Sequence, residues 1–224
     1  LATIFAQDSE WDDALIYITL ALDNSSIFME NWAQLKFAIH VEKKQYMLAL
    51  EVAQDLVRVK PKNKPYIEQM AGVYNVIKFE EESLAALEFK LQQNLLTKSS
   101  EYVNLANFYL YKKLPIDSSK VIEKGLKLKI LKNDIKNNEL LSNAYIIAKD
   151  FENAIRALVN VTKISDDSKY DYRIGQIYLQ NSDYSDAIKF FKIAREKGWK
   201  YKPGSLELLI GICFIELDNF DSAR

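Results

Sequence analysis

The stretch GQIYLQNSDYSDAIKFFKIA, residues 175–194, decides the fold. Gly175 is followed three residues later by Tyr178, so a small and an aromatic side chain lie one turn apart on one helical face. A second small residue, Ala187, precedes another aromatic residue by one helical turn. Residues 180–183, which lie between the two pairs, are rich in side chains that favour turns. The stretch therefore predicts two antiparallel helices, each with a small residue that lets its partner approach closely.

The same features recur along the whole chain. A small residue returns every 33–36 residues, at Ala14, Ala49, Ser83, Ser118, Ala154, Ala187 and Ala223. In six of these segments a second small residue lies twelve positions earlier, at Ala2, Ala71, Ala106, Ser142, Gly175 and Gly211. Three residues after each of these comes an aromatic residue, at Phe5, Tyr74, Tyr109, Tyr145, Tyr178 and Phe214. A further aromatic series, three residues before the first, comprises Trp11, Tyr46, Phe151, Tyr184 and Phe220. Self-similarity at a fixed period predicts an all-α solenoid of stacked helix pairs.

Composition excludes several classes of function. The 30 Lys and Arg against 31 Asp and Glu give a net charge of -1, so the chain as a whole lacks the basic excess typical of proteins that bind nucleic acid or anionic lipid. The longest apolar runs, residues 14–22 and 208–215, are shorter than the ~20 residues of a membrane span. We therefore expect neither a nucleic-acid partner nor direct membrane insertion.

Catalytic and metal-binding patterns are missing from the sequence. His40 is the single histidine, and Cys213 is the single cysteine and lies in an apolar run. These two residues make no zinc motif and no nucleophile–base pair by sequence. We interpret Cys213 as a small buried residue, and His40 as a helix residue that is either packed or exposed. We expect no enzyme activity, no metal and no cofactor. The basic series Lys120, Lys124, Lys127, Lys129 and Lys132 is interpreted as a solvated outer face, with a partner-binding patch as the alternative.

The repeat resembles the tetratricopeptide repeat, in which a period of ~34 residues carries W-x2-L-G-x2-Y…A-x3-F…P. Gly175-x2-Tyr178 and Ala187-x3-Phe191 match its centre, and Trp32-x2-Leu35 matches its start. Pro115 replaces the usual aromatic and is expected to begin a helix, and the repeat at Trp32 is out of register by one residue.

The resemblance implies a single right-handed superhelical solenoid over residues 1–224. Its seven expected repeats, of which the first and last are truncated, are residues 1–29, 30–63, 64–98, 99–134, 135–167, 168–203 and 204–224.

The resemblance also implies a binding surface. In tetratricopeptide proteins the first helix of each repeat lines a concave groove that holds a protein or peptide partner. The residues expected to line the groove here are Gln34, Glu42, Glu68, Asn75, Asn107, Tyr111, Asn143, Lys169, Tyr172, Arg173, Gln176 and Gln180. Amides and tyrosines suit an extended peptide, because they can bond its backbone without selecting its sequence.

An alternative partner is a peptide C-terminus. Chaperone-binding members of the family grip a C-terminal carboxylate with a set of Lys, Asn and Arg, and Asn107, Lys169 and Arg173 occupy three of those five positions. Val103 and Leu140 stand at the other two, so the set is incomplete. This hypothesis describes a cytoplasmic, co-chaperone-like adaptor.

A narrower resemblance concerns periplasmic tetratricopeptide proteins that accompany ExbB, ExbD and TonB energy-transduction systems of Gram-negative bacteria. It is carried by segments that include residues 95–106, 120–126, 165–179 and 197–204. The resemblance implies a periplasmic scaffold that assists a TonB-type complex. A third hypothesis is that the chain is a regulatory part of a larger enzyme.

The ends of the chain suggest a piece of a longer protein. It opens on Leu1 and ends on Arg224, so a signal peptide is expected upstream for the periplasmic hypothesis. The truncated last repeat is expected to leave partly uncovered the apolar residues Leu208, Leu209, Ile212 and Phe214. Homo-association through such uncapped terminal repeats is therefore a further expectation.

Overall fold

The structure is a computed structural model, and it describes residues 1–218. Over this range the regular elements are all α-helices, which confirms the all-α fold class. They are α1 (Ala2–Gln7), α2 (Trp11–Asp23), α3 (Glu30–Glu42), α4 (Tyr46–Val59), α5 (Lys64–Val76), α6 (Glu80–Gln92), α7 (Ser99–Tyr111), α8 (Pro115–Lys127), α9 (Ile135–Ile147), α10 (Phe151–Thr162), α11 (Ser168–Gln180), α12 (Tyr184–Glu196) and α13 (Ser205–Glu216). Phe220 and Ala223 of the repeated series lie outside the described residues.

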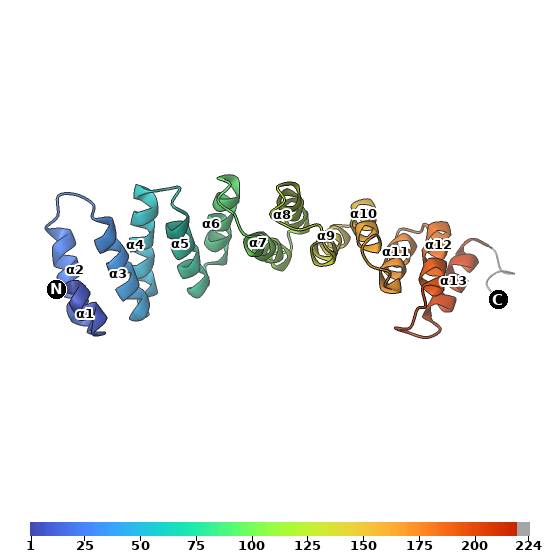
Figure 1. The fold of residues 1–224 in the computed structure, drawn as a ribbon, viewed down its shortest axis with the longest axis horizontal. Helices are drawn as coiled ribbons and strands as arrows, with labels where there is room; N and C mark the ends of the chain where they lie inside the picture. Colours follow the sequence, from blue (N-terminus) through green and yellow to red (C-terminus); the bar gives the residue numbers. More distant parts are fainter. Residues whose placement is uncertain (219–224) are drawn as a thin grey trace. The chain divides into compact units, whose positions relative to one another are not determined.

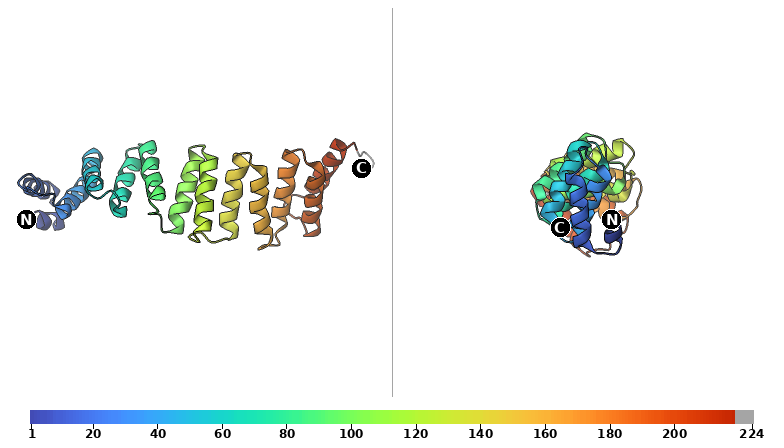
Figure 2. Two further views of the ribbon diagram at one scale, coloured as in Figure 1. Left: turned by 90° about the horizontal axis from the view of Figure 1, so that it is seen from above. Right: turned by 90° about the vertical axis from the view of Figure 1, so that its left-hand side faces the viewer.

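The chain divides into two compact units. Unit 1, Leu1–Thr97, holds α1–α6, and unit 2, Lys98–Arg224, holds α7–α13. Within each unit every helix contacts the helix before it and the helix after it. Successive helices run in opposite directions (Figure 1 and Figure 2). Each unit is therefore a stack of antiparallel helices, as the repeat predicts.

Helix starts in unit 2 follow from local residue chemistry. Asp134 Oδ1 accepts a hydrogen bond from the backbone N–H of Asn137 at 2.9 Å ahead of α9, and Asp150 caps α10 in the same way. Pro115 is the first residue of α8, where its missing N–H costs no hydrogen bond. The helix start expected at Pro115 is therefore confirmed.

The first series of small residues lies in the core of the stack. Its described members Ala14, Ala49, Ser83, Ser118, Ala154 and Ala187 are all 0–4% exposed. Gly175 shows why the second series is small as well, because a Cβ at this position would lie 2.6 Å from atoms of the Phe191 ring. A larger residue there would have to displace that ring, since close-packed interiors have little spare volume.

The lone histidine and cysteine are both packed in helices, which confirms the burial expected of Cys213 and shows that His40 is packed and not exposed. His40 on α3 is 4% exposed, and its Nδ1 lies 2.8 Å from Gln45 Oε1. Cys213 on α13 is fully buried in a cluster with Phe191 and Leu206, and this burial raises the pKa of its thiol. A raised thiol pKa keeps Cys213 protonated and unreactive.

Two buried hydroxyls lead to a prediction about stability. Ser118 and Ser142 stand at small-residue positions, both are fully buried, and neither Oγ has a hydrogen-bond partner among the described residues. We expect each of Ser118→Ala and Ser142→Ala to raise the free energy of unfolding by about 1 kcal/mol, because an unsatisfied buried hydroxyl is removed. Urea unfolding followed by circular dichroism measures this. Ser83→Ala is the control, because Ser83 Oγ donates to the carbonyl of Ala71 at 3.2 Å, and it should bring no gain.

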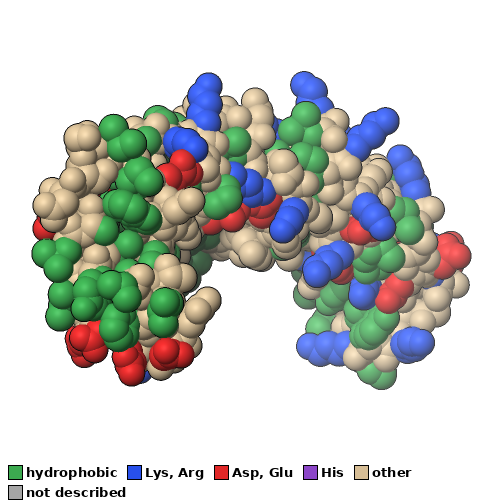
Figure 3. Space-filling model, turned by 60° about the vertical axis from the view of Figure 1, so that its left-hand side comes forward, with side chains coloured by type: hydrophobic (Ala, Val, Ile, Leu, Met, Phe, Trp, Pro, Cys, Tyr) green, Lys and Arg blue, Asp and Glu red, His purple; other side chains and the backbone are tan. Residues whose placement is uncertain are grey.

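The surface is mixed in character. Hydrophobic side chains reach it in several places, and lysine and arginine side chains stand out from it, many of them at the outline of the molecule (Figure 3). In residues 1–218, no helix combines the length and the apolar character that crossing a membrane requires.

Candidate functional site

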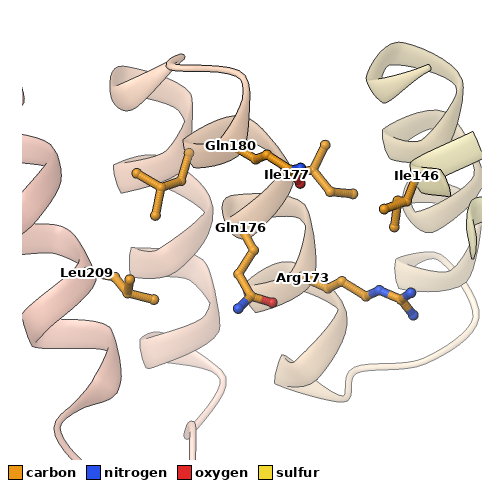
Figure 4. Close-up of a pocket in the computed structure, with 7 residues that line it drawn as sticks. Ile146, Arg173, Gln176, Ile177, Gln180 and Leu209 are labelled. Carbon is orange, nitrogen blue, oxygen red and sulfur yellow. The ribbon is translucent and has the colours of Figure 1, made fainter. Parts of the chain in front are cut away.

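A pocket in unit 2 contains several of the groove residues expected from the sequence. Its volume is about 420 Å³, and it lies between α9, α11 and α13. The lining residues are Ile146, Arg173, Gln176, Ile177, Leu179, Gln180 and Leu209. Figure 4 shows that Arg173, Gln176 and Gln180 project from one helix, while Ile146 and Leu209 come from the helices on either side.

The spacing along α11 explains how this helix supplies most of the pocket. Arg173, Gln176, Ile177 and Gln180 lie at i, i+3, i+4 and i+7, which is one face of an α-helix. The opposite face carries Ile174 and Gly175, which are buried. Because packing holds that inner face in place, Gln176 and Gln180 are held exposed to solvent, while Ile177 on the same face is buried.

Arg173 is the charged group of the pocket. Its side chain is half-buried, and its Nη2 donates a hydrogen bond to Oδ1 of Asn143 on α9. Within the described residues no carboxylate forms an ion pair with this guanidinium. A guanidinium is always charged and offers five donors, so Arg173 keeps donors for a further acceptor. Asn143 orients it without neutralising it.

Lys169, one turn before Arg173, is already engaged by carboxylates. Its Nζ lies 3.7 Å from Asp167 Oδ2 and 4.0 Å from Glu139 Oε1. A hydrogen bond with Tyr170 raises the pKa of Lys169 above its ordinary value, and the two carboxylates act in the same direction. Lys169 is therefore charged but locally compensated, unlike Arg173.

Tyr172 belongs more to the core than to the groove. Its ring stacks on Trp199 with 4.1 Å between centroids and lies 5.7 Å from the Phe191 ring. Its hydroxyl accepts a hydrogen bond from Gln176 Nε2 at 3.2 Å. Only the hydroxyl end of Tyr172 therefore reaches the polar face of α11.

The remaining predicted groove residues of unit 2 lie on α7. Asn107 and Tyr111 are both exposed, and Tyr111 is 68% exposed with its ring 6.3 Å from that of Phe108. Neither residue lines the pocket. The set expected to grip a carboxylate therefore reaches this pocket only through Arg173.

In unit 1 the predicted residues form pairs along the first helices. The side-chain amides of Gln34 on α3 and Gln69 on α5 exchange hydrogen bonds of 3.1 and 3.0 Å. Glu68 on α5 accepts from Nζ of Lys90 at 2.8 Å, and Lys90 is only 3% exposed. The carboxylate of Glu68 thus compensates a buried ammonium group. Glu42 and Asn75 are exposed.

Sequence reasoning missed the apolar walls of the pocket. Ile146, Ile177 and Leu209 lie on the first helices of their repeats, α9, α11 and α13, and only Ile177 directly follows a predicted groove residue, Gln176. The repeat does not predict that Ile146 and Leu209 line a pocket, because its recurring small and aromatic residues identify only the positions that pack within one helix pair. Among the described residues, no group of three or more His, Cys, Asp or Glu could hold a metal ion.

Known structures share this architecture. One chain in the structure of Naa15/Naa10 bound to HypK-THB matches 99% of this chain with a TM-score of 0.75 and 15% identity, although the match covers only 34% of that chain. A tetratricopeptide repeat protein from Parabacteroides merdae ATCC 43184 matches 99% of this chain and 86% of its own, with a TM-score of 0.52 and 12% identity. YrrB, a TPR protein with an unusual peptide-binding site, matches 78% of this chain and 88% of its own, with a TM-score of 0.50 and 15% identity.

These likenesses are likenesses of fold. No family model matches the chain, and no curated protein sequence matches it. At such low identity, the solved structures establish the arrangement of helices and not a shared partner. The chain has the all-α helical repeat solenoid fold that tetratricopeptide repeat proteins share.

Proposed function

We propose that this chain is a non-catalytic scaffold that binds a segment of a partner protein along its first helices. The observation that carries the proposal is the pocket beside α11. It combines a half-buried guanidinium, Arg173, with the amides of Gln176 and Gln180 and with apolar walls from Ile146 and Leu209.

An extended peptide suits this pocket better than a small rigid ligand. Glutamine amides carry both donors and acceptors, so Gln176 and Gln180 can bond a peptide backbone in either direction. The apolar walls can cover one aliphatic side chain, and about 420 Å³ is in the range of sites for small ligands or single side-chain anchors. YrrB, which shares the fold, is described as having a peptide-binding site.

Selection from a library of displayed random dodecapeptides tests the proposal. The affinity of selected peptides for the whole chain is then measured by fluorescence anisotropy. We expect Arg173→Ala to weaken binding at least about tenfold, because a charge-assisted hydrogen bond is lost. Arg156→Ala is the matched control, since Arg156 on α10 is exposed, pairs with Glu152 at 3.1 Å and lies outside the pocket. Equal affinities for the wild type and the Arg173 variant would reject this pocket as the binding site.

We also propose, on the segment resemblance described above, that the partner belongs to a TonB-type energy-transduction complex and that the chain works in the periplasm. Co-purification from native membranes tests this proposal. Enrichment of ExbB, ExbD or TonB over an unrelated periplasmic bait supports it, and equal recovery with both baits rejects it.

The adaptor hypothesis makes a different prediction for the peptide. A grip on a C-terminal carboxylate requires free cations, yet Lys169 is already paired with Glu139 and Asp167. We therefore favour an internal segment of the partner. Amidation of the C-terminus of a selected peptide distinguishes the two hypotheses, because only the adaptor hypothesis predicts lost binding.

A further inference from the structure

Three turns of unit 2 lie at the same end of its helices. They connect α8 to α9, α10 to α11 and α12 to α13, and the first two follow one another along the lower edge of the left view in Figure 2. Direct contacts link neighbouring repeats at this end. The Tyr201 hydroxyl, in the third turn, donates to the Asp167 carboxylate in the second at 2.7 Å, and Lys169, in the first turn of α11, lies 4.0 Å from Glu139 on α9.

This end of unit 2, which we call the basic edge, is strongly positive. The basic edge comprises residues 124–136, 163–169 and 195–202, which hold eleven Lys and Arg against four Asp and Glu. The turns at the opposite end, residues 110–118, 146–153 and 179–186, hold three Lys against five Asp and Glu. A chain with a net charge of -1 therefore concentrates positive charge along one edge of one unit.

The carboxylates of the basic edge are largely occupied with local structure. Asp134 caps α9, and Asp167 caps α11 by accepting from the backbone N–H of Lys169 at 3.0 Å. By contrast, Lys129, Lys132 and Lys202 are exposed, and no ion pair engages their ammonium groups within the described residues.

Each of the three turns also exposes one large hydrophobic residue. Leu128 is 49% exposed, Ile164 is 51% exposed and Tyr201 is 52% exposed. These residues stand directly beside lysines, at Lys127 and Lys129, at Lys163, and at Lys200 and Lys202. An apolar tip surrounded by lysines recurs in all three turns, so the pattern is not a single loop feature.

We infer that the basic edge docks unit 2 onto the anionic headgroup surface of a lipid bilayer. Lysines near an anionic membrane each contribute roughly fivefold to the affinity, and the effect is confined to about a Debye length. The three exposed hydrophobic side chains at the tips can enter the interfacial region of the bilayer, as the apolar side chains of surface-bound helices do. The contact is peripheral, because no described helix can span the bilayer.

The composition of the basic edge favours lipid over nucleic acid. Ten of its eleven cations are Lys and one is Arg, although Arg is better suited to bidentate phosphate contacts and to stacking on bases. Two of the three tips are aliphatic, so they cannot stack on bases as the ring of Tyr201 could. Docking through these turns also leaves the pocket beside α11 accessible, because none of the pocket residues lies in the turns.

Flotation with vesicles tests the inference. The whole chain is mixed with vesicles of phosphatidylcholine alone, or with vesicles of phosphatidylcholine that also contain the anionic lipid phosphatidylserine. We expect binding only to the anionic vesicles, with affinity falling as salt rises. Four charge reversals, K129E, K132E, K200E and K202E together, should lower the partition coefficient at least about 100-fold.

A matched variant separates the basic edge from net charge. This control variant reverses four exposed lysines outside the basic edge, with the substitutions K62E, K78E, K113E and K189E. Its net charge changes by the same amount, and it should retain most of the vesicle binding. Equal loss in both variants, or no binding of the wild type to anionic vesicles at low salt, would overturn the inference. Circular dichroism confirms that both variants are folded.

A second pair of measurements addresses the tips and the competing class of partner. L128S and I164S together should weaken vesicle binding about tenfold while leaving its salt dependence unchanged, because apolar burial is not screened. The binding of a 20-base-pair DNA duplex is measured in parallel. If the duplex binds as tightly as anionic vesicles, and if the four lysine reversals weaken its binding equally, the basic edge would be assigned to nucleic acid instead.

Discussion

Replacing Phe191 with alanine is expected to lower the free energy of unfolding by about 3–5 kcal/mol. Phe191 on α12 is fully buried and contacts the Tyr172 ring, the Gly175 backbone and a cluster that includes Cys213. Its removal costs the transfer energy of the ring and leaves a cavity between α11 and α12. The neighbours are packed on further helices, so collapse into the cavity is limited.

Urea unfolding followed by tryptophan fluorescence measures this loss. Trp199, one of the three tryptophans, packs against the same cluster, so part of the signal reports unfolding at the site of the change. Phe190→Ala is the matched control, because Phe190 is the adjacent residue, is only partly buried and stacks on Tyr178 at 5.5 Å. A loss for Phe191→Ala no larger than that of the control would contradict the packing argument.

Adding a side chain at Gly175 tests the same contact from the other side. Gly175→Val is expected to cost about 2–3 kcal/mol, because the first added carbon alone would lie 2.6 Å from the Phe191 ring. Intrinsic helix propensity works in the other direction, since valine is a better helix former than glycine by about 0.5 kcal/mol. The steric term is several times larger and decides the sign.

Gly72 is the control for this substitution. It also lies within a helix, α5, but nothing lies within 4 Å of a Cβ built on it. Gly72→Val should therefore change stability by no more than about 0.5 kcal/mol.

A double variant, Gly175→Val with Phe191→Ala, tests the contact directly. The valine at position 175 should fill part of the cavity, so the double variant should lose less stability than the sum of the two single losses. Strict additivity would show that the side chains at positions 175 and 191 are not in contact.

Much of the site could be placed on helices from the sequence. The repeat fixes the phase of α11, so Arg173, Gln176 and Gln180 follow as residues of its outer face. Their neighbours across the pocket could not be placed, because Ile146 and Leu209 come from helices whose separation depends on packing. The sequence also predicts that Tyr172, like Gln176, lines the groove. Only the contact with Trp199 shows that the Tyr172 ring is packed.

The sequence by itself determined the all-α repeat, the helix start at Pro115 and the burial of the first small-residue series. These features depend on chemistry within one helix or on one helix pair, and local spacing records both. The tertiary structure decided which side chains share a pocket, that Lys90 is a buried cation opposite Glu68, and that three distant turns form one basic edge. Such features depend on distances between helices, and those distances are set by how whole side chains pack.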